Sequence, residues 1–129
     1  MARVPIVHVG DVLIATVHEE LHDRDAIRLQ EELGATLERT SAAGVLLDLS
    51  IVETVDSFLG RMINDVASSA RLLGAHSVVV GIQPAVAITL VELGLELKGV
   101  HTALNAARGM ELLHQLHARE LRNGHRRAG

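Results

Sequence analysis

Short aliphatic runs alternate with amphipathic segments along this chain, and this alternation restricts the possible fold more than any other feature of the sequence. Residues 45–49 and 76–80 are each apolar enough to form a strand that is buried on both faces. The segments that follow them carry apolar residues at helical spacing. Buried strands that alternate with helices typically build a largely parallel sheet with helices packed on it. The chain is therefore predicted to be an α/β protein.

The order of the predicted elements is β-β-α-β-α-β-α-β-α. Residues 4–9 and 12–17 are β-rich runs joined by Gly10-Asp11, a link that favours a type II′ hairpin. This hairpin is expected to lead into a mixed, largely parallel sheet with about four helices. The later elements are a helix from Asp23 or Asp25 to about 41, a strand at 45–49, a helix from about 56 to 74, a strand at 76–80, a helix at 85–93, a strand near 100–102 and a helix from about 105 to 121. The apolar face of the first helix is predicted to contain Ala26, Ile27, Leu29, Leu33 and Leu37.

The length and composition indicate one domain. A chain of 129 residues is long enough for one hydrophobic core, which we assign to residues 1–121. Residues 122–129 are polar and basic, and we predict a flexible tail there. A net charge of −4 and a 1% aromatic content argue against binding to nucleic acid. No apolar run approaches membrane-spanning length, and the absence of cysteine fits a reducing cytoplasm.

Two histidine patterns are candidate metal sites. Residues 18–22 match H-E-x-x-H, which binds zinc only when both histidines lie on one helical face. Here the match falls between a predicted strand and a predicted helix, so a solvent-exposed loop is favoured. His114, His117 and Glu111 can share a face of the last helix, but three ligands on one exposed helix would make a weak site. We predict no metal and no cofactor.

The pair Asp56-Ser57 stands where a predicted helix begins, just after the strand at 45–49. Aspartate and serine are preferred helix caps, and a helix N-terminus also stabilises a phosphate. Residues at the carboxyl ends of strands often carry the function of an α/β protein. Ser57 lacks the G-x-S-x-G setting of a hydrolase nucleophile, which argues against a serine hydrolase.

Several stretches together resemble one known family. Residues 47–50 and 55–57 (LDLS and VDS) look like the core of the STAS domain, the anti-sigma-factor-antagonist fold. Residues 81–94 and 102–104 narrow this resemblance to the small RsbS-type scaffold proteins of the bacterial stressosome. The likeness extends over about residues 4 to 118, and the stretch 81–94 is its most specific part.

The resemblance implies that Ser57 accepts a phosphate from a switch serine/threonine kinase. Simpler antagonists usually carry another Ser or Thr and a glycine after this serine. Here residues 58–60 read Phe-Leu-Gly, which favours the stressosome branch. The residues expected to support the site or contact a partner are Asp48, Asp56, Phe58 and Thr89.

The implied function is that of a non-catalytic scaffold in the cytoplasm, which regulates a general stress response. Its expected partners are the switch kinase, an RsbR-type STAS paralogue and a PP2C-type phosphatase, and it is expected to self-associate into a large complex. One alternative is a free-standing antagonist that binds an anti-sigma kinase directly. Two further alternatives are a small hydrolase and a module that binds a small ligand at the strand ends.

Overall fold

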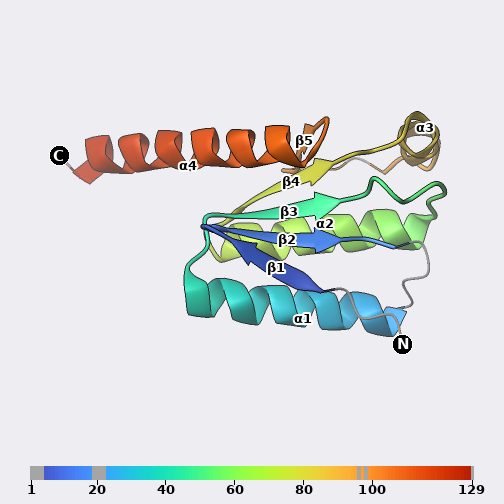
Figure 1. The fold of residues 1–129 in the computed structure, drawn as a ribbon, viewed down its shortest axis with the longest axis horizontal. Coiled ribbons are helices and arrows are strands. Elements are labelled where there is room, and N and C mark those ends of the chain that lie inside the picture. The colour runs from blue at the N-terminus through green and yellow to red at the C-terminus, as the bar shows by residue number, and fades with distance from the viewer. Residues whose placement is uncertain (1–4, 19–22, 96, 98, 129) are drawn as a thin grey trace.

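The computed structural model describes residues 5–18, 23–95, 97 and 99–128. They form five strands and four helices in the predicted order (Figure 1). The elements are β1 (Ile6–Val9), β2 (Val12–Thr16), α1 (Asp23–Thr40), β3 (Gly44–Asp48), α2 (Ser57–Leu72), β4 (His76–Val80), α3 (Pro84–Glu92), β5 (His101–Ala103) and α4 (Ala106–Ala128).

The sheet is mixed and its strands follow the chain order β1-β2-β3-β4-β5. Strands β1 and β2 are antiparallel, and all later neighbours are parallel. The turn between β1 and β2 is Gly10-Asp11, with a φ of 60° at Gly10, and Ser41 is the only described non-glycine residue with a positive φ. A positive φ at the first turn position alone matches the predicted type II′ hairpin.

Helices cover the sheet on both faces. On one face, Val45 and Leu47 of β3 join a large core with side chains from α1 and α2. On the other face, Leu46 joins a smaller core with Leu113 of α4. Alternate residues of a strand point to opposite faces, so a continuous apolar run such as β3 is needed where both faces are covered.

The predicted helix after the strand at 45–49 carries six apolar residues at helical spacing, and α2 confirms them as a buried face: Leu59, Met62, Ile63, Val66, Ala67 and Ala70. The predicted face of α1 is wrong at Ile27, whose side chain is 56% exposed. The other four predicted residues, Ala26, Leu29, Leu33 and Leu37, are confirmed as its buried stripe. Ile27 lies about 100° around the helix from Ala26, so it falls outside this stripe.

Helix α4 runs to Ala128, past the predicted helix end at Leu121. Most of the predicted tail is therefore helical in the structure, while its flexibility stays a prediction. Among the described residues, no helix is both long enough and apolar enough to cross a membrane.

Candidate functional site

Ser57 is the first residue of α2, at the end of the sheet where the parallel strands finish. Asp56 precedes it with extended backbone (φ −116°, ψ 177°), and its Oδ1 accepts a hydrogen bond of 2.9 Å from the Leu59 N–H. Asp56 alone is therefore the N-cap, a role worth about 1 kcal/mol relative to alanine. Ser57 is not needed for capping, and its side chain is exposed.

The backbone around Ser57 favours a negative group on its hydroxyl. The first N–H groups of a helix have no partner within the helix and form the positive end of its dipole. The Asp56 carboxylate binds one of these groups, the Leu59 N–H. A phosphate on Ser57 would lie beside this helix end, where anions are commonly bound.

Asp48 ends β3 and shapes the loop that leads to α2. Its Oδ1 accepts a hydrogen bond of 2.9 Å from the Ser50 N–H, and its side chain is half-buried. Its backbone carbonyl accepts a bond of 2.9 Å from the Val17 N–H, which extends the pairing of β2 and β3. Asp48 thus holds the start of the loop that carries Ser57.

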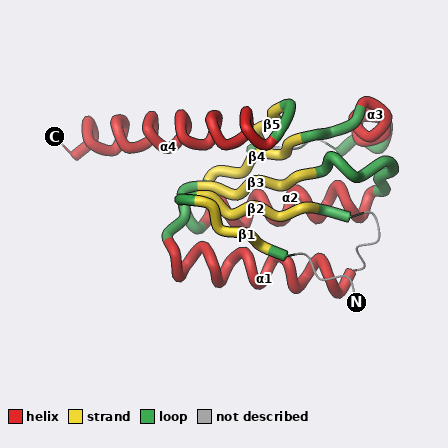
Figure 2. The backbone as a smooth tube through the Cα atoms, in the orientation of Figure 1, coloured by secondary structure: helices red, strands yellow, loops and turns green. Residues whose placement is uncertain are grey.

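A second loop packs against the first at this end of the sheet, and both are visible in Figure 2 beyond the ends of β3 and β4. Gln83 Nε2 donates to the Ser50 carbonyl at 2.9 Å. Gly81 has a φ of +74°, and a Cβ there would lie 2.9 Å from Ser50 Cβ. Only glycine fits both the backbone conformation and this close approach. Gln83 and Gly81 therefore position α3 beside the loop that carries Ser57.

Phe58 and Gly60 let the first turn of α2 pack closely against the rest of the domain. Phe58 is half-buried and packs against the large core. A Cβ on Gly60 would lie 2.4 Å from Leu95 Cδ1 and 3.3 Å from Leu90 Cδ2. The absence of a side chain at Gly60 lets Leu90 of α3 and Leu95 approach α2 closely.

Thr89, the candidate second hydroxyl, lies on α3. Its Oγ1 donates to the Ala85 carbonyl at 2.9 Å, one turn earlier in the same helix. The hydroxyl proton of Thr89 is thus engaged locally.

Exposed apolar side chains lie at the same end of the molecule, and they were not among the residues predicted from the sequence. Ile51, in the loop before α2, is 50% exposed. Ile88 and Val91 of α3 are 59% and 79% exposed. Helix α3 has apolar residues on all sides, a pattern that typically marks a helix covered on more than one face. The mostly apolar sequence of residues 84–91 was therefore the signal that could have indicated this exposed apolar surface.

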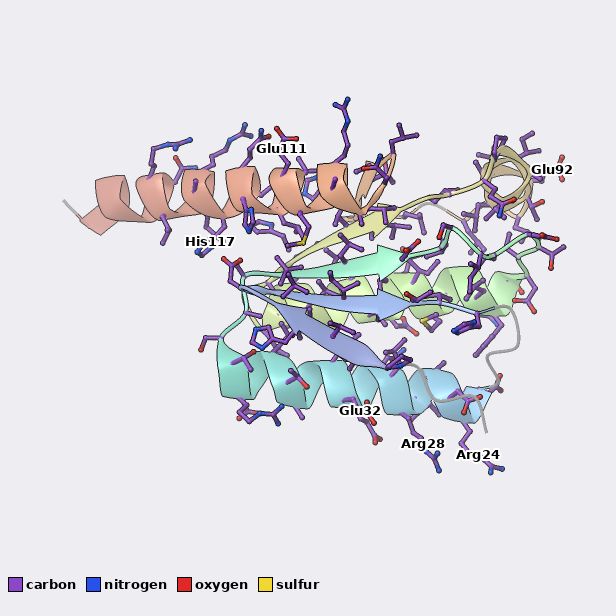
Figure 3. The ribbon with its side chains drawn as sticks, in the orientation of Figure 1. Arg24, Arg28, Glu32, Glu92, Glu111 and His117 are labelled. Carbon is purple, nitrogen blue, oxygen red and sulfur yellow. The ribbon has the colours of Figure 1, made fainter. Side chains whose placement is uncertain are left out.

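The histidine patterns give no metal site in the described part of the chain, which contains no group of three or more potential ligands. The pattern at 18–22 lies outside the described residues except for His18. On α4, Glu111 points away from the sheet and His117 lies on the opposite side of the helix, so these two candidate ligands are not brought together (Figure 3). His114 instead contacts Asp11 at 3.2 Å.

The described residues form a small α/β domain with an exposed serine at the start of the helix that follows the central strand. The chain belongs to the STAS domain family, whose model matches residues 3–107.

Two solved structures resemble this chain over most of its length. A serine-to-glutamate variant of RsbS from Moorella thermoacetica is 41% identical with a TM-score of 0.77, and the match covers 89% of this chain and 97% of that one. A chain from a structure describing the molecular architecture of the stressosome is 42% identical with a TM-score of 0.77, covering 87% and 97%. The predicted STAS fold is therefore confirmed.

Two curated relatives come from Bacillus subtilis (strain 168). The RsbT co-antagonist protein RsbRD is 35% identical over 67% of this chain and 32% of its own length. The RsbT co-antagonist protein RsbRA is 30% identical over 77% of this chain and 35% of its own length. The match thus spans about a third of each of these relatives.

Proposed function

We propose that this protein is a non-catalytic scaffold subunit of a bacterial stressosome, which holds a switch serine/threonine kinase and releases it when Ser57 is phosphorylated. The observation that carries the proposal is the exposed Ser57 at the first position of α2, in a chain 41% identical to an RsbS protein. The partners would be an RsbR-type STAS paralogue in the complex and a PP2C-type phosphatase that resets the serine. The site would act in the cytoplasm, in control of a general stress response.

The unmodified surface around Ser57 is suited to docking. Exposed aliphatic side chains at Ile51, Ile88 and Val91 lie at the end of the sheet that carries Ser57. Burying aliphatic area of this kind drives association, at about 25 cal/mol per Å². The hydrogen bond from Gln83 to the Ser50 carbonyl fixes the position of α3 relative to the loop before α2. A kinase would thus meet a preformed surface, which limits the entropy lost on binding.

Phosphorylation would change the charge of this surface. Residues 48–60 contain three acidic residues (Asp48, Glu53 and Asp56) and no basic residue. A phosphate would add about −1.5 to −2 charges. A dianion held against apolar groups in an interface is costly to desolvate, and it repels an acidic partner edge. The helix end stabilises the phosphate in the free protein, so release of the kinase is favoured.

A charge substitution tests this mechanism. Ser57→Asp is expected to weaken kinase binding about tenfold, because it adds a carboxylate to an already acidic edge. Ser57→Asn is the matched control, since it has nearly the same size as the aspartate and no charge, and it should bind within about twofold of wild type. Calorimetric titration with the co-encoded kinase measures both. Equal affinities for the two variants would show that charge does not drive the release.

The size of the assembly distinguishes a stressosome subunit from the alternative, a free-standing antagonist. A stressosome subunit mixed with its RsbR-type paralogue should elute as a very large assembly in size-exclusion chromatography with light scattering. A monomer or dimer in every mixture would favour direct binding to an anti-sigma kinase.

A further inference from the structure

Helix α3 contacts the chain both before and after Ser57. Gln83, the residue that precedes α3, donates a hydrogen bond to the loop before the serine. Leu90 of α3 packs on Gly60, one turn into α2. Both contacts act on a single stretch of chain, residues 50–60, which contains the loop and the first turn of α2. We call residues 50–60 the acceptor segment.

The contact before Ser57 fixes Ser50, where the acceptor segment begins. The Ser50 carbonyl accepts a bond of 2.9 Å from Gln83 Nε2, and the Ser50 N–H donates at 2.9 Å to Asp48 Oδ1. Gly81 lies so close that a Cβ there would be 2.9 Å from Ser50 Cβ. Gln83 occupies the N-cap position of α3, yet its side chain makes no cap bond. Its amide therefore joins α3 to the acceptor segment instead of completing α3.

The contact after Ser57 depends on the missing side chain of Gly60. A Cβ at Gly60 would overlap Leu95 Cδ1 and would lie 3.3 Å from Leu90 Cδ2. Leu90 is buried in the large core, so this contact is closed to solvent. Gly60 lies three residues after Ser57, and residues three apart are neighbours on the surface of a helix. The packing of α3 therefore bears on the turn of α2 that carries Ser57.

The placement of Ser57 matters for the reaction proposed there. In that reaction the serine oxygen bonds to the γ-phosphorus of ATP held by the kinase, the bond from that phosphorus to the ADP oxygen breaks, and the serine proton passes to a base on the kinase. Phosphoryl transfer depends mainly on positioning, and a shift of about 1 Å can cost on the order of a hundredfold in rate. The first turn of a helix is also the part that frays, because its N–H groups have no partner within the helix. Contacts that hold this turn therefore act on the rate of transfer.

We infer that α3 is a clamp on the acceptor segment, and that Gln83 and Gly60 are positioning residues for the transfer of phosphate to Ser57. The inference rests on the proposed function, because it concerns the same serine. Ile88 and Val91, which the kinase is proposed to contact, are exposed on the same helix. A kinase bound to α3 thus holds the element that places its own acceptor.

Two substitutions loosen the clamp at different ends. Gln83→Met keeps the length of the side chain and removes the amide donor, and Gly60→Val puts a branched side chain into the space of Leu95. Each is expected to lower kcat for phosphorylation of Ser57 about fivefold, as for the loss of one hydrogen bond of ordinary net strength. Intact-mass spectrometry over a range of substrate concentrations measures kcat and KM. A fall in kcat reports placement, since weaker docking or partial unfolding of the substrate protein would raise KM and leave kcat unchanged.

The matched controls carry the same substitutions elsewhere. Gln30→Met replaces a half-buried glutamine on α1, and Gly34→Val fills a position whose Cβ would lie 4.0 Å from Leu73 Cδ1, its nearest neighbour beyond the helix. Both should keep the wild-type kcat. Hydrogen exchange at the Leu59 N–H, which Asp56 Oδ1 accepts, measures the first turn of α2 without the kinase. It should be about fivefold faster in the two clamp variants and unchanged in the controls.

The outcomes keep the clamp and the proposed function apart. Wild-type kcat and wild-type exchange at Leu59 in Gln83→Met and Gly60→Val would overturn the inference. If Ser57→Ala blocks phosphorylation and both clamp variants keep the wild-type kcat, the proposed function stands and the inference fails. If Ser57→Ala still accepts phosphate while the clamp variants exchange faster, the proposed function fails, and the hold of α3 on the acceptor segment stands without a role in phosphate transfer.

Discussion

Ser57→Ala is expected to abolish phosphate transfer to this protein by the co-encoded switch kinase, with less than about a hundredth of the wild-type rate remaining. The hydroxyl is the acceptor in the proposed reaction, and alanine has none. Intact-mass spectrometry over a time course measures the number of phosphates added. The expected products are one phosphate per chain for wild type and none for the variant.

The loss should not reflect unfolding. Asp56 Oδ1, not Ser57, binds the Leu59 N–H, so the helix cap survives the substitution. Ser50→Ala and Ser68→Ala are matched controls, because Ser50 is an exposed serine in the loop before α2 and Ser68 is an exposed serine on α2 itself. Both should accept phosphate at the wild-type rate. A phosphate that persists in Ser57→Ala and disappears in either control would move the site to that residue.

Gly109→Ala is expected to lower the free energy of unfolding by about 2 kcal/mol, although alanine is the better helix former. A Cβ at Gly109 would lie 2.6 Å from Val80 Cγ1 and 2.9 Å from Leu46 Cδ1. Val80 is β-branched and buried, so it has little freedom to turn away. Helix α4 would therefore have to lift from the sheet.

Gly34→Ala is the matched control for this prediction. Gly34 is also within a helix, and a Cβ there would lie 4.0 Å from Leu73 Cδ1, its nearest neighbour beyond the helix. The same substitution should therefore raise stability by about 0.5–1 kcal/mol. Urea denaturation of both variants measures whether each substitution lowers or raises the free energy of unfolding. A Gly109→Ala protein as stable as Gly34→Ala would mean that α4 does not pack this closely on β3 and β4.

Much of the fold could be predicted because burial leaves a clear pattern in the sequence. The strand His76–Val80 was predicted with both ends correct, since a run of valines lies between Gly74 and Gly81. The buried face of α2 was also predicted in full, because six apolar residues recur at helical spacing. In both cases local composition and tertiary burial favour the same structure.

The errors occurred where local sequence and packing disagree. Ile27 is apolar, but the position of α1 against α2 and the sheet buries Ala26, Leu29, Leu33 and Leu37 and leaves Ile27 exposed. The end of α4 was placed at Leu121 because the following residues are polar and include Gly124. The helix continues to Ala128, since one glycine within a helix costs only about 1 kcal/mol.

The candidate site was only partly visible in the sequence. Asp56 and Ser57 were recognised as a helix start, because both residue types are favoured there. Their separate roles as cap and first helical residue depend on backbone angles that sequence does not specify. The bond from Gln83 to Ser50 joins residues from two loops, and no spacing rule predicts it. The position of α3 beside Ser57 therefore required the structure.

A phosphate on Ser57 is proposed to release the kinase, and a comparison of two forms of the same chain measures this release. Protein with phosphoserine incorporated at position 57 and unmodified protein are titrated with the kinase in the presence of the RsbR-type paralogue. We expect the unmodified form to hold the kinase in the large assembly, and the phosphorylated form to bind it at least about tenfold more weakly. Equal affinity of the two forms would show that the phosphate on Ser57 does not release the kinase.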